Sequence, residues 1–342
     1  VQGSVHQDRQ AGGRVAPLMA DLRIRADRST AEERRAVDDV LTADDHAIVR
    51  ETERLVRGGH RRRTARRHLL LPALHALQHE IGWISPGGLD YVCDLLQVPP
   101  AEAYGVATFY DLFRVDDPGH RESVHHVCVD PACQIAGADV LADRLRAEGD
   151  HVHDSPCLGQ CERAPATFVQ GVGEPDHVPA DLSNGVRHHS IGIADPASAT
   201  SSVGRSVRLL DRVGVVDPVS LDSYRQNGGY AALTRAVDLG PQLVIDEIRA
   251  AGLVGRGGAA FPTAVKWQGV LDQPDGSKHV IANADESEPG TFKDRAVMER
   301  DPFAVVEGLT LAGLTVGAEH GWIYIRGEYP LATERLTGAI EQ

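Results

Sequence analysis

Apolar residues recur with helical spacing in the first third of the chain. One helical face follows residue 68 and is made of Leu69, Leu70, Leu71, Leu74 and Leu77. Further helical segments are expected over residues 88–96 and 100–112. Each of these two begins at a proline-containing turn, which suits a helix N-terminus. The pattern predicts a small helical bundle.

From residue 123 the pattern changes to short strands that alternate with helices. We expect strands over residues 124–129, 151–154 and 166–170, with a helix over 138–147, which together indicate a compact α/β domain. The last third of the chain also alternates between helical and strand patterns. It predicts a helix over 230–251, a strand over 280–282, a helix over 303–316 and a strand over 321–325.

Two segments lack this periodicity. Residues 1–60 are polar and charged, with Thr30-Ala31-Glu32-Glu33 resembling a capping box for a surface helix, and are expected to be an extension. Residues 171–207 are rich in Gly, Pro, Ser, Asp and His, as in a linker. The expected division is an extension (1–60), a bundle with an α/β domain (61–170), a linker (171–207) and a second α/β domain (208–342).

Composition narrows the class of function. The chain has 342 residues, and 49 acidic against 35 basic residues give a formal net charge of -14. Such a field repels nucleic acid. The arginines at 61–63, 66 and 67 lead into the apolar helical face that follows residue 68, so they are interpreted as a solvated helix start. No apolar run approaches the roughly 18 residues of a membrane span, which argues against direct membrane insertion. The N-terminus also lacks the layout of a secretory signal, so we expect a cytoplasmic protein.

Four of the five cysteines form two close pairs, Cys128-x4-Cys133 and Cys157-x3-Cys161. Four thiolates suit either zinc or an iron-sulfur cluster, and loops wider than the C-x2-C zinc knuckle favour iron-sulfur. A disulfide or unrelated core thiols are the alternatives. Cys93 stands alone among apolar residues of an expected helix and is interpreted as a core residue.

A glycine-rich loop follows the helical pattern at 241–251. Gly255 and Gly257 match the first glycines of a dinucleotide fingerprint, but a helix rather than a strand precedes them, which excludes an ordinary Rossmann motif. Exposed backbone N–H groups, with the charges of Arg256 and Lys266, favour an anionic ligand. A glycine-rich surface turn is the alternative.

Two later segments carry polar and aromatic groups beside expected strands. Residues 283–295 place four carboxylates and one amide in a single loop, and residues 324–329 end a strand with a glycine, a carboxylate and two tyrosines. Buried carboxylates are costly unless they bind something or are well solvated. Each segment alone could also be a polar turn or a strand end.

The motifs of the first half resemble a known family. His79-Glu-Ile-Gly-Trp-Ile-Ser-Pro86, Ala107-Thr-Phe-Tyr110 and the two cysteine pairs, the second within Cys157-Leu-Gly-Gln-Cys161-Glu-Arg-Ala-Pro165, resemble the small thioredoxin-like [2Fe-2S] flavoprotein subunit of respiratory complex I. The resemblance implies a helical bundle before a thioredoxin-like ferredoxin domain. It also implies one [2Fe-2S] cluster with Cys128, Cys133, Cys157 and Cys161 as ligands.

The second half, from about Leu209, resembles the FMN- and NADH-binding flavoprotein subunit of complex I and of NAD-linked hydrogenases and formate dehydrogenases. The resemblance implies that the glycine loop with Gly255, Arg256, Gly257 and Lys266 holds FMN phosphate and the nucleotide. The implied flavin contacts are Asn283, Asp285, Glu286, Tyr324, Gly327 and Glu328. The implied NADH contacts are Phe261, Glu288 and Lys266.

Two residues depart from the family's pattern. Ala260 stands where the family commonly has glycine, and Gly269 stands where a second aromatic residue is expected. The flavin domain is also expected to be incomplete, because the family's later segments and the ligands of its [4Fe-4S] cluster are absent from this chain.

The expected fold is α/β, with a helical bundle and a thioredoxin-like ferredoxin domain linked to an incomplete FMN-binding domain. The resemblance implies an NADH dehydrogenase (diaphorase) module that passes hydride from NADH to FMN and single electrons to iron-sulfur clusters, with no catalytic side chain. Its implied partners are other iron-sulfur subunits of a complex I-like, hydrogenase or formate dehydrogenase assembly, in the cytoplasm or at the cytoplasmic face of a membrane complex. The alternative is a non-catalytic scaffold with a zinc site.

Overall fold

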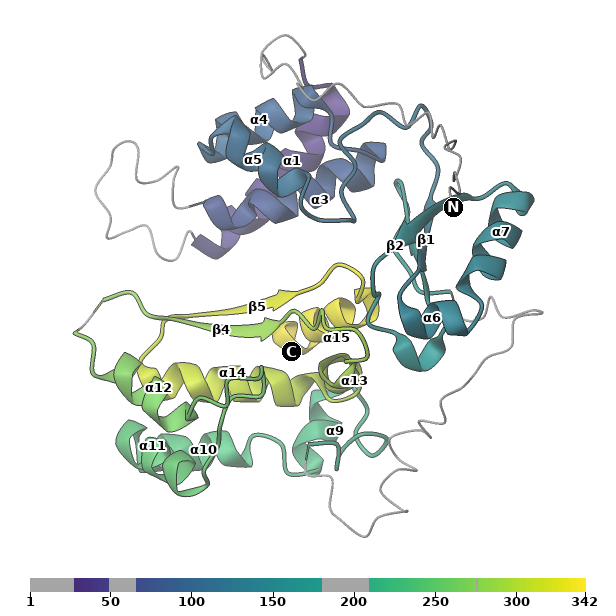
Figure 1. Ribbon diagram of the computed structural model, residues 1–342. Coiled ribbons are helices and arrows are strands. Elements are labelled where there is room, and N and C mark those ends of the chain that lie inside the picture. Colours follow the sequence, from purple (N-terminus) through teal and green to yellow (C-terminus); the bar gives the residue numbers. More distant parts are fainter. Residues whose placement is uncertain (1–27, 49–65, 180–208, 275) are drawn as a thin grey trace, which may run out of the picture. The chain divides into compact units, whose positions relative to one another are not determined.

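The computed structural model describes residues 28–48, 66–179, 209–274 and 276–342, and it divides into two compact units, residues 1–121 and 122–342 (Figure 1). The expected arginine-rich helix start at 61–63 and most of the expected linker lie outside the described residues.

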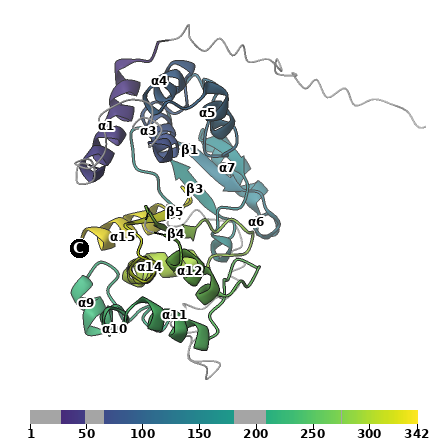
Figure 2. The ribbon, with the colours of Figure 1, turned by 90° about the vertical axis from the view of Figure 1, so that its left-hand side faces the viewer.

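The described part of the first unit is helical, as expected. Its elements are α1 (Ala31–Ile48), the 3-10 turn η3 (Arg67–Leu69), α3 (Leu70–Ile81), α4 (Pro86–Leu96) and α5 (Pro100–Ala107). Figure 2 shows α1, α3, α4 and α5 gathered into one bundle. Helix α5 ends earlier than the predicted residue 112, since the Thr108 hydroxyl donates to the Tyr104 carbonyl and a turn follows.

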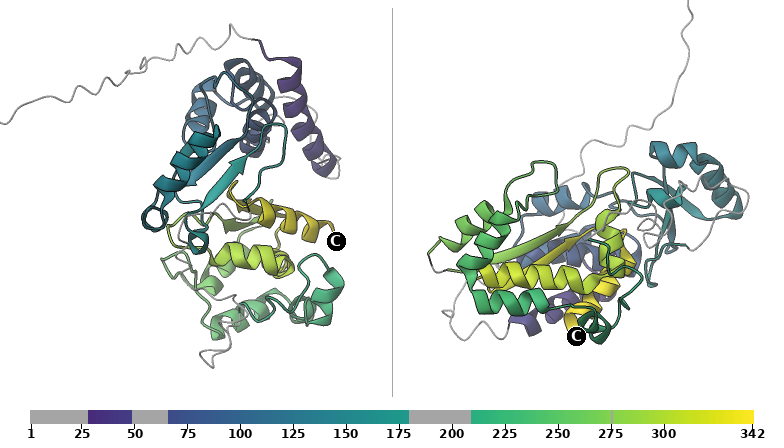
Figure 3. Two further views of the ribbon diagram at one scale, coloured as in Figure 1. Left: turned by 90° about the vertical axis from the view of Figure 1, so that its right-hand side faces the viewer. Right: turned by 90° about the horizontal axis from the view of Figure 1, so that it is seen from below.

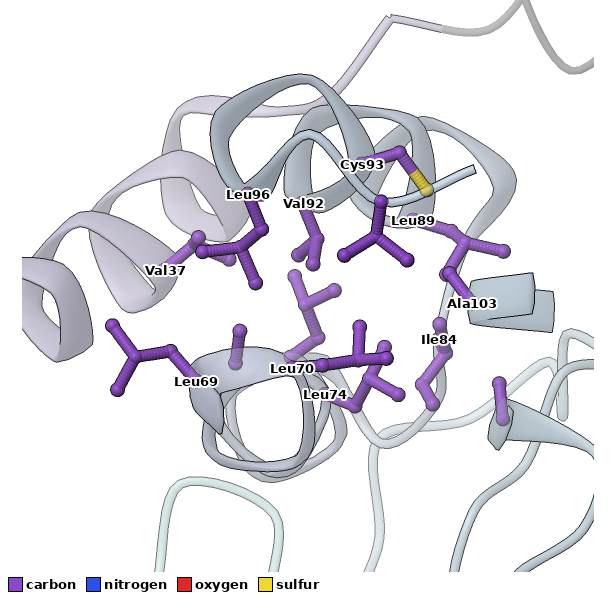
Figure 4. Close-up of a cluster of buried hydrophobic side chains, with 14 of the residues drawn as sticks. Val37, Leu69, Leu70, Leu74, Ile84, Leu89, Val92, Cys93, Leu96 and Ala103 are labelled. Atoms are coloured by element: carbon purple, nitrogen blue, oxygen red, sulfur yellow. The ribbon is translucent and has the colours of Figure 1, made fainter. Parts of the chain in front are cut away.

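The bundle encloses one apolar core, drawn in Figure 4. Val37, Leu74, Val92 and Leu96 are fully buried there. Cys93 lies among them, and burial raises the pKa of its thiol to about 11. This thiol is therefore a core side chain, as its apolar neighbours predicted.

Helix α1 belongs to this bundle, although the sequence predicted an extension over residues 1–60. Val37 and Leu41 of α1 are buried in the shared core. The predicted capping box is present, because Thr30 N donates to the Glu33 carboxylate (2.6 Å) and Glu33 N donates to Thr30 Oγ1 (3.2 Å). Only a few apolar residues of α1 face the core, between many charges, which is why its pattern looked like a surface segment.

The second unit begins with a small α/β domain. Its elements are β1 (Val124–Cys128), α6 (Pro131–Ile135), α7 (Ala138–Glu148), β2 (His151–Ser155), η4 (Cys161–Arg163) and β3 (Thr167–Gln170). The sheet has the order β2-β1-β3, with β1 parallel to β2 and antiparallel to β3. Helix α7 packs on β1 and β2, and this confirms the strand and helix pattern expected over residues 124–170.

The rest of the second unit is again α/β. Its elements are α9 (Leu221–Gln226), α10 (Ala231–Leu239), α11 (Pro241–Ala250), α12 (Thr263–Leu271), β4 (His279–Ala284), α13 (Lys293–Arg300), α14 (Pro302–Val316), β5 (His320–Ile325) and α15 (Pro330–Glu341). Strands β4 and β5 are parallel, with α13 and α14 between them in sequence. Figures 1 and 2 show the strands above a layer of α12 and α14, with α9, α10 and α11 beyond it.

One expected helix is divided in two. The pattern over residues 230–251 forms α10 and α11, because Gly240 has a φ of 79° and Pro241 begins the second helix. A proline lacks the N–H that a continuous helix would need at this point.

The two faces of the β4–β5 sheet differ. Ala284, Ile323 and Ile325 pack with Met298 and other apolar residues of α13 and α15, and α14 lies against the sheet (Figure 3). Ile281 and Trp322 alternate with this set and are exposed. Among the described residues, no helix is both long enough and apolar enough to cross a membrane.

Candidate functional site

The four paired cysteines meet in one buried place. Cys128 ends β1, Cys133 lies in α6, and Cys157 and Cys161 flank the loop after β2. The Sγ atoms of Cys157 and Cys161 are 3.6 Å apart, and the Cys128 thiol hydrogen bonds to those of Cys133 and Cys157. All four are free thiols with at most 9% of their surface exposed. The fold thus joins the two sequence pairs into one group.

Each of these sulfurs also has a backbone N–H directed at it. For Cys128, Cys133, Cys157 and Cys161 the donors are, in that order, the amides of Asp130, Ala166, Gly159 and Gly290. Two of these donors are distant in sequence from their sulfur. The distance from Ala166 N to Cys133 Sγ is 3.4 Å, and that from Gly290 N to Cys161 Sγ is 3.3 Å. Such donors stabilise negative sulfur, which is how proteins adjust iron-sulfur clusters.

The donor set fits a four-thiolate metal group. The hydrogen bond with Cys133 raises the pKa of the Cys128 thiol to about 11, so this thiol is largely protonated without a metal. Metal binding would release such protons and leave thiolates that already have N–H partners. Cys128, Cys133, Cys157 and Cys161 are the residues that would hold a [2Fe-2S] cluster.

The glycine-rich loop between α11 and α12 is closed on itself. Gly255 N donates to the Phe261 carbonyl, and Thr263 N donates to the Leu253 carbonyl. Each N···O distance is 2.9 Å. Arg256 and Gly257 are exposed within the loop, as is Phe261 at its end. Helix α12 begins directly afterwards at Thr263. Exposed amides before a helix N-terminus suit an anionic group.

Ala260 has a φ of 51°, in the left-handed region that favours glycine. This is the position at which the sequence departs from the family's glycine. Lys266 lies exposed on the first turns of α12, and Gly269 is exposed further along the same helix. The loop therefore keeps the backbone shape of a glycine-rich loop with an alanine side chain in it.

The acidic loop starts at the carboxyl end of β4. Asn283 pairs in register with Tyr324 of β5, so both side chains lie on the same exposed face at the strand ends. Asn283 Oδ1 accepts from Asp285 N (3.1 Å), and Asp285 accepts from Ser287 Oγ (2.7 Å). Ligands of open parallel sheets bind at this edge, and contacts of these residues with flavin stay a prediction.

Glu286 and Glu288 face different surroundings. Glu288 is exposed, whereas Glu286 is 2% exposed and its carboxylate accepts from Asp294 N (2.9 Å) and Arg295 N (3.0 Å) at the start of α13. Glu286 therefore closes the acidic loop onto this helix. A contact of either residue with flavin or nucleotide stays a prediction.

The segment after β5 connects the acidic loop with the cysteines. Arg326 forms a two-pronged ion pair with Glu328 (2.7 and 3.1 Å). It also donates to the Glu286 carbonyl (2.8 Å) and to the Cys157 carbonyl (2.6 Å). Gly327 lies between the two charged residues and is half-buried. The flavin-side motifs and the cysteine loop thus share one set of contacts.

The sequence did not show which residues form this contact. Arg295, Arg326 and Tyr329 lie within or beside the noted motifs, but Arg295 and Arg326 find their partners in the cysteine loop more than a hundred residues away. Gly159 was noted only as part of the cysteine motif. A pattern of neighbours cannot show such a pairing, whereas an alignment with covarying positions could.

Comparisons with known proteins match two separate segments of the chain. Residues 59–186 match the family model of the thioredoxin-like [2Fe-2S] ferredoxin, and residues 248–342 match that of the Nuo51 FMN-binding domain. The first match contains all four clustered cysteines. The second contains the glycine-rich loop, the acidic loop and the end of β5.

Individual relatives match the same parts of the chain. An NADH-quinone oxidoreductase subunit of Aquifex aeolicus is 48% identical over 123 residues, which is 36% of this chain and 29% of the relative. The alpha subunit of the NAD-reducing hydrogenase HoxS of Cupriavidus necator is 31% identical over 288 residues, covering 76% of this chain and 46% of the relative. The chain thus spans less than half the length of these relatives.

A solved structure extends the likeness to the fold. A crystal structure of an NAD+-reducing [NiFe]-hydrogenase in the air-oxidized state superposes with a TM-score of 0.59 at 25% identity, covering 83% of this chain and 50% of the other. Four clustered thiols thus lie in a segment that matches the thioredoxin-like [2Fe-2S] ferredoxin family, and the glycine-rich and acidic loops lie in a segment that matches the Nuo51 FMN-binding domain.

Proposed function

We propose that this chain is the electron-entry module of an NADH:acceptor oxidoreductase, in which NADH reduces FMN and the [2Fe-2S] cluster accepts single electrons. The observation that carries the proposal is the contact between the two matched domains. The acidic loop that follows β4 donates its Gly290 amide to Cys161, so the proposed flavin edge and the cluster ligands form one connected region. Flavin supplies the conversion between two-electron and one-electron steps.

The side chains of the chain would bind and orient rather than transfer protons. The glycine loop with Gly255, Arg256, Gly257 and Lys266 would hold phosphate, and Asn283, Asp285 and Tyr324 would contact the flavin ring at the strand ends. Phe261 and Glu288 are exposed, as contacts with a nucleotide require. Glu286 and Glu328 would act mainly by shaping the loops, since both are engaged by neighbouring donors.

The relatives suggest the kind of assembly. The proteins named above are subunits of an NADH-quinone oxidoreductase and of an NAD-reducing hydrogenase, and we propose that this chain likewise delivers electrons to further iron-sulfur subunits. We place this assembly in the cytoplasm or at the cytoplasmic face of a membrane complex.

The test is to purify the chain without oxygen and assay iron, zinc and flavin on the same sample, with visible and EPR spectra. We expect two irons per chain, a [2Fe-2S] EPR signal on reduction with dithionite, and bleaching of bound FMN by NADH. NADPH serves as the comparison nucleotide. Zinc without iron, and no flavin, would instead favour the non-catalytic scaffold.

A further inference from the structure

We propose that Arg326, which lies outside the cysteine ligand set, positions the Cys157–Cys161 ligand loop and, with the Gly290 amide, sets the reduction potential of the [2Fe-2S] cluster. The proposal rests on the function proposed above, because it needs the cluster to be present. It makes the flavin-side domain part of the surroundings of the cluster rather than only a neighbour that supplies electrons.

The contacts of Arg326 are directed at both sides of the region. Its side chain is 8% exposed. One Nη atom donates to the Cys157 carbonyl at a distance of 2.6 Å, and the other donates to the Glu286 carbonyl at 2.8 Å. The guanidinium also pairs with Glu328. A planar guanidinium can hold three acceptors in fixed directions, which a lysine cannot do. Arg326 therefore fixes the carbonyl of one cluster ligand relative to the acidic loop.

A second arginine supports the same loop. Arg295, whose side chain is 5% exposed, donates from Nε to the Gly159 carbonyl (3.2 Å) and pairs with Glu162, the residue after Cys161. Burial alone would lower the pKa of Arg295, but the charges of Glu299 and Glu162 raise it, so this group is a permanent cation. Arg326 therefore holds the start of the ligand loop at Cys157, and Arg295 holds its middle and end at Gly159 and Glu162.

Tyr329 lies close to both arginines. The guanidinium carbons of Arg326 and Arg295 lie 5.3 and 5.8 Å from its ring centroid, and the side chain is 1% exposed. Gly159 has a φ of 65°, and a Cβ at this residue would overlap the Tyr329 hydroxyl. The close approach of the loop to Tyr329 therefore requires glycine at this position.

Gly290 supplies the last of the four sulfur donors. The amides directed at Cys128, Cys133 and Cys157 come from the ferredoxin domain itself, whereas the amide directed at Cys161 belongs to the acidic loop. Arg326 holds that loop through the Glu286 carbonyl. Displacing Arg326 would therefore disturb the loop that carries this N–H···S bond as well as the ligand loop.

The charges predict the direction of the effect. Reduction adds one negative charge to a cluster, so nearby cations and N–H donors raise its potential and nearby carboxylates lower it. Removing the charge of Arg326 leaves Glu328 without its cationic partner and should lower the potential. Removing the charge of Glu328 leaves the guanidinium without its counter-charge and should raise it.

The experiment is an EPR-monitored redox titration of the whole chain, comparing R326Q and E328Q with wild type. R235Q is the control, since Arg235 is 67% exposed on α10 and pairs with Glu247 away from the cysteines. We expect at least a tenfold fall in the ratio of reduced to oxidised cluster at fixed potential for R326Q, about 59 mV for one electron. E328Q should shift in the opposite direction, and R235Q should match wild type.

Opposite shifts of the reduction potential in the two variants support the proposal. Loosened packing alone would not make the sign of the shift depend on which charge is removed. Shifts of the same sign, or none beyond that of R235Q, would overturn it. If R326Q retains no iron, E328Q decides alone, with a raised potential in support and an unchanged or lowered one against. A wild-type chain that binds iron in no [2Fe-2S] form would overturn the proposed function and this inference together, whereas a normal wild-type signal with unshifted variants would overturn only the inference.

Discussion

At the scale of single residues, the five cysteines have two distinct surroundings that burial alone does not reveal. Cys93 and Cys133 are both buried, at 4% and 1% exposure. Cys93 lies among aliphatic side chains, whereas Cys133 lies beside another thiol and accepts from the Ala166 amide. The neighbours of the sulfur therefore distinguish Cys93, a core thiol, from Cys133, a proposed metal ligand.

This contrast gives a direct test of the ligand set. We expect Cys133→Ser to abolish the visible absorption of the cluster, because a serine cannot replace a thiolate ligand without changing the metal site. Cys93→Ser should retain the absorption while lowering stability by about 1–3 kcal/mol through a buried hydroxyl. Iron content and visible spectra of the two variants provide the measurement, and equal losses in both would contradict the assignment.

Ala260 carries a backbone cost that glycine would relieve. A left-handed conformation costs a non-glycine residue about 1–2 kcal/mol, partly offset by the greater freedom of glycine in the unfolded chain. We expect Ala260→Gly to raise the free energy of unfolding by about 0.5–1 kcal/mol. The neighbouring Ala259 is not among the residues with positive φ, so Ala259→Gly should lower it by a similar amount. Thermal or denaturant unfolding measures both, and a loss with Ala260→Gly would contradict the strain.

At the scale of the helices and strands, the bundle depends on one buried carboxylate. Glu33 is 2% exposed, caps its own helix through Thr30 and also accepts from Ser85 Oγ. Ser85 in turn caps α4 by accepting from Gly88 N (2.9 Å). One side chain therefore joins the starts of α1 and α4.

Replacing this carboxylate should destabilise two helix starts at once. We expect Glu33→Ala to lower the free energy of unfolding of the bundle by about 1–3 kcal/mol, since it removes a capping box and leaves buried donors without an acceptor. The adjacent Glu32 is the matched control, because its side chain is 44% exposed and forms a surface ion pair with Arg121 at 3.0 Å. Denaturant unfolding of Glu33→Ala and Glu32→Ala tests this, and similar losses in both would refute it.

Element boundaries show what the sequence could and could not predict. Strong apolar periodicity located α3, α4, α14 and the strands, and the motif Thr30–Glu33 correctly predicted the start of α1. The division at Gly240–Pro241 was open to prediction from the proline. The packing of α1 in the bundle could not be predicted, because it depends on which surface contacts Val37 and Leu41.

At the scale of the whole molecule, the order of the two matched domains and their cofactor chemistry could be predicted from motifs. The cysteine pairs predicted one four-thiol group, and the structure brings all four sulfurs together. The contacts between the domains could not be predicted in this way. Arg326 reaches Cys157 and Gly290 reaches Cys161 only after folding, and neither pairing leaves a periodic trace in the sequence.

The Gly290–Cys161 bond also has a consequence for biosynthesis. The two residues are 129 positions apart, so a ribosome adding about 5–20 residues per second makes the amide roughly 6 to 26 s after the cysteine. During that interval the four cysteines can already leave the ribosome, while one of the four sulfurs still lacks its N–H donor. A cluster inserted so early would sit in a nascent domain whose last stabilising contact has yet to be translated.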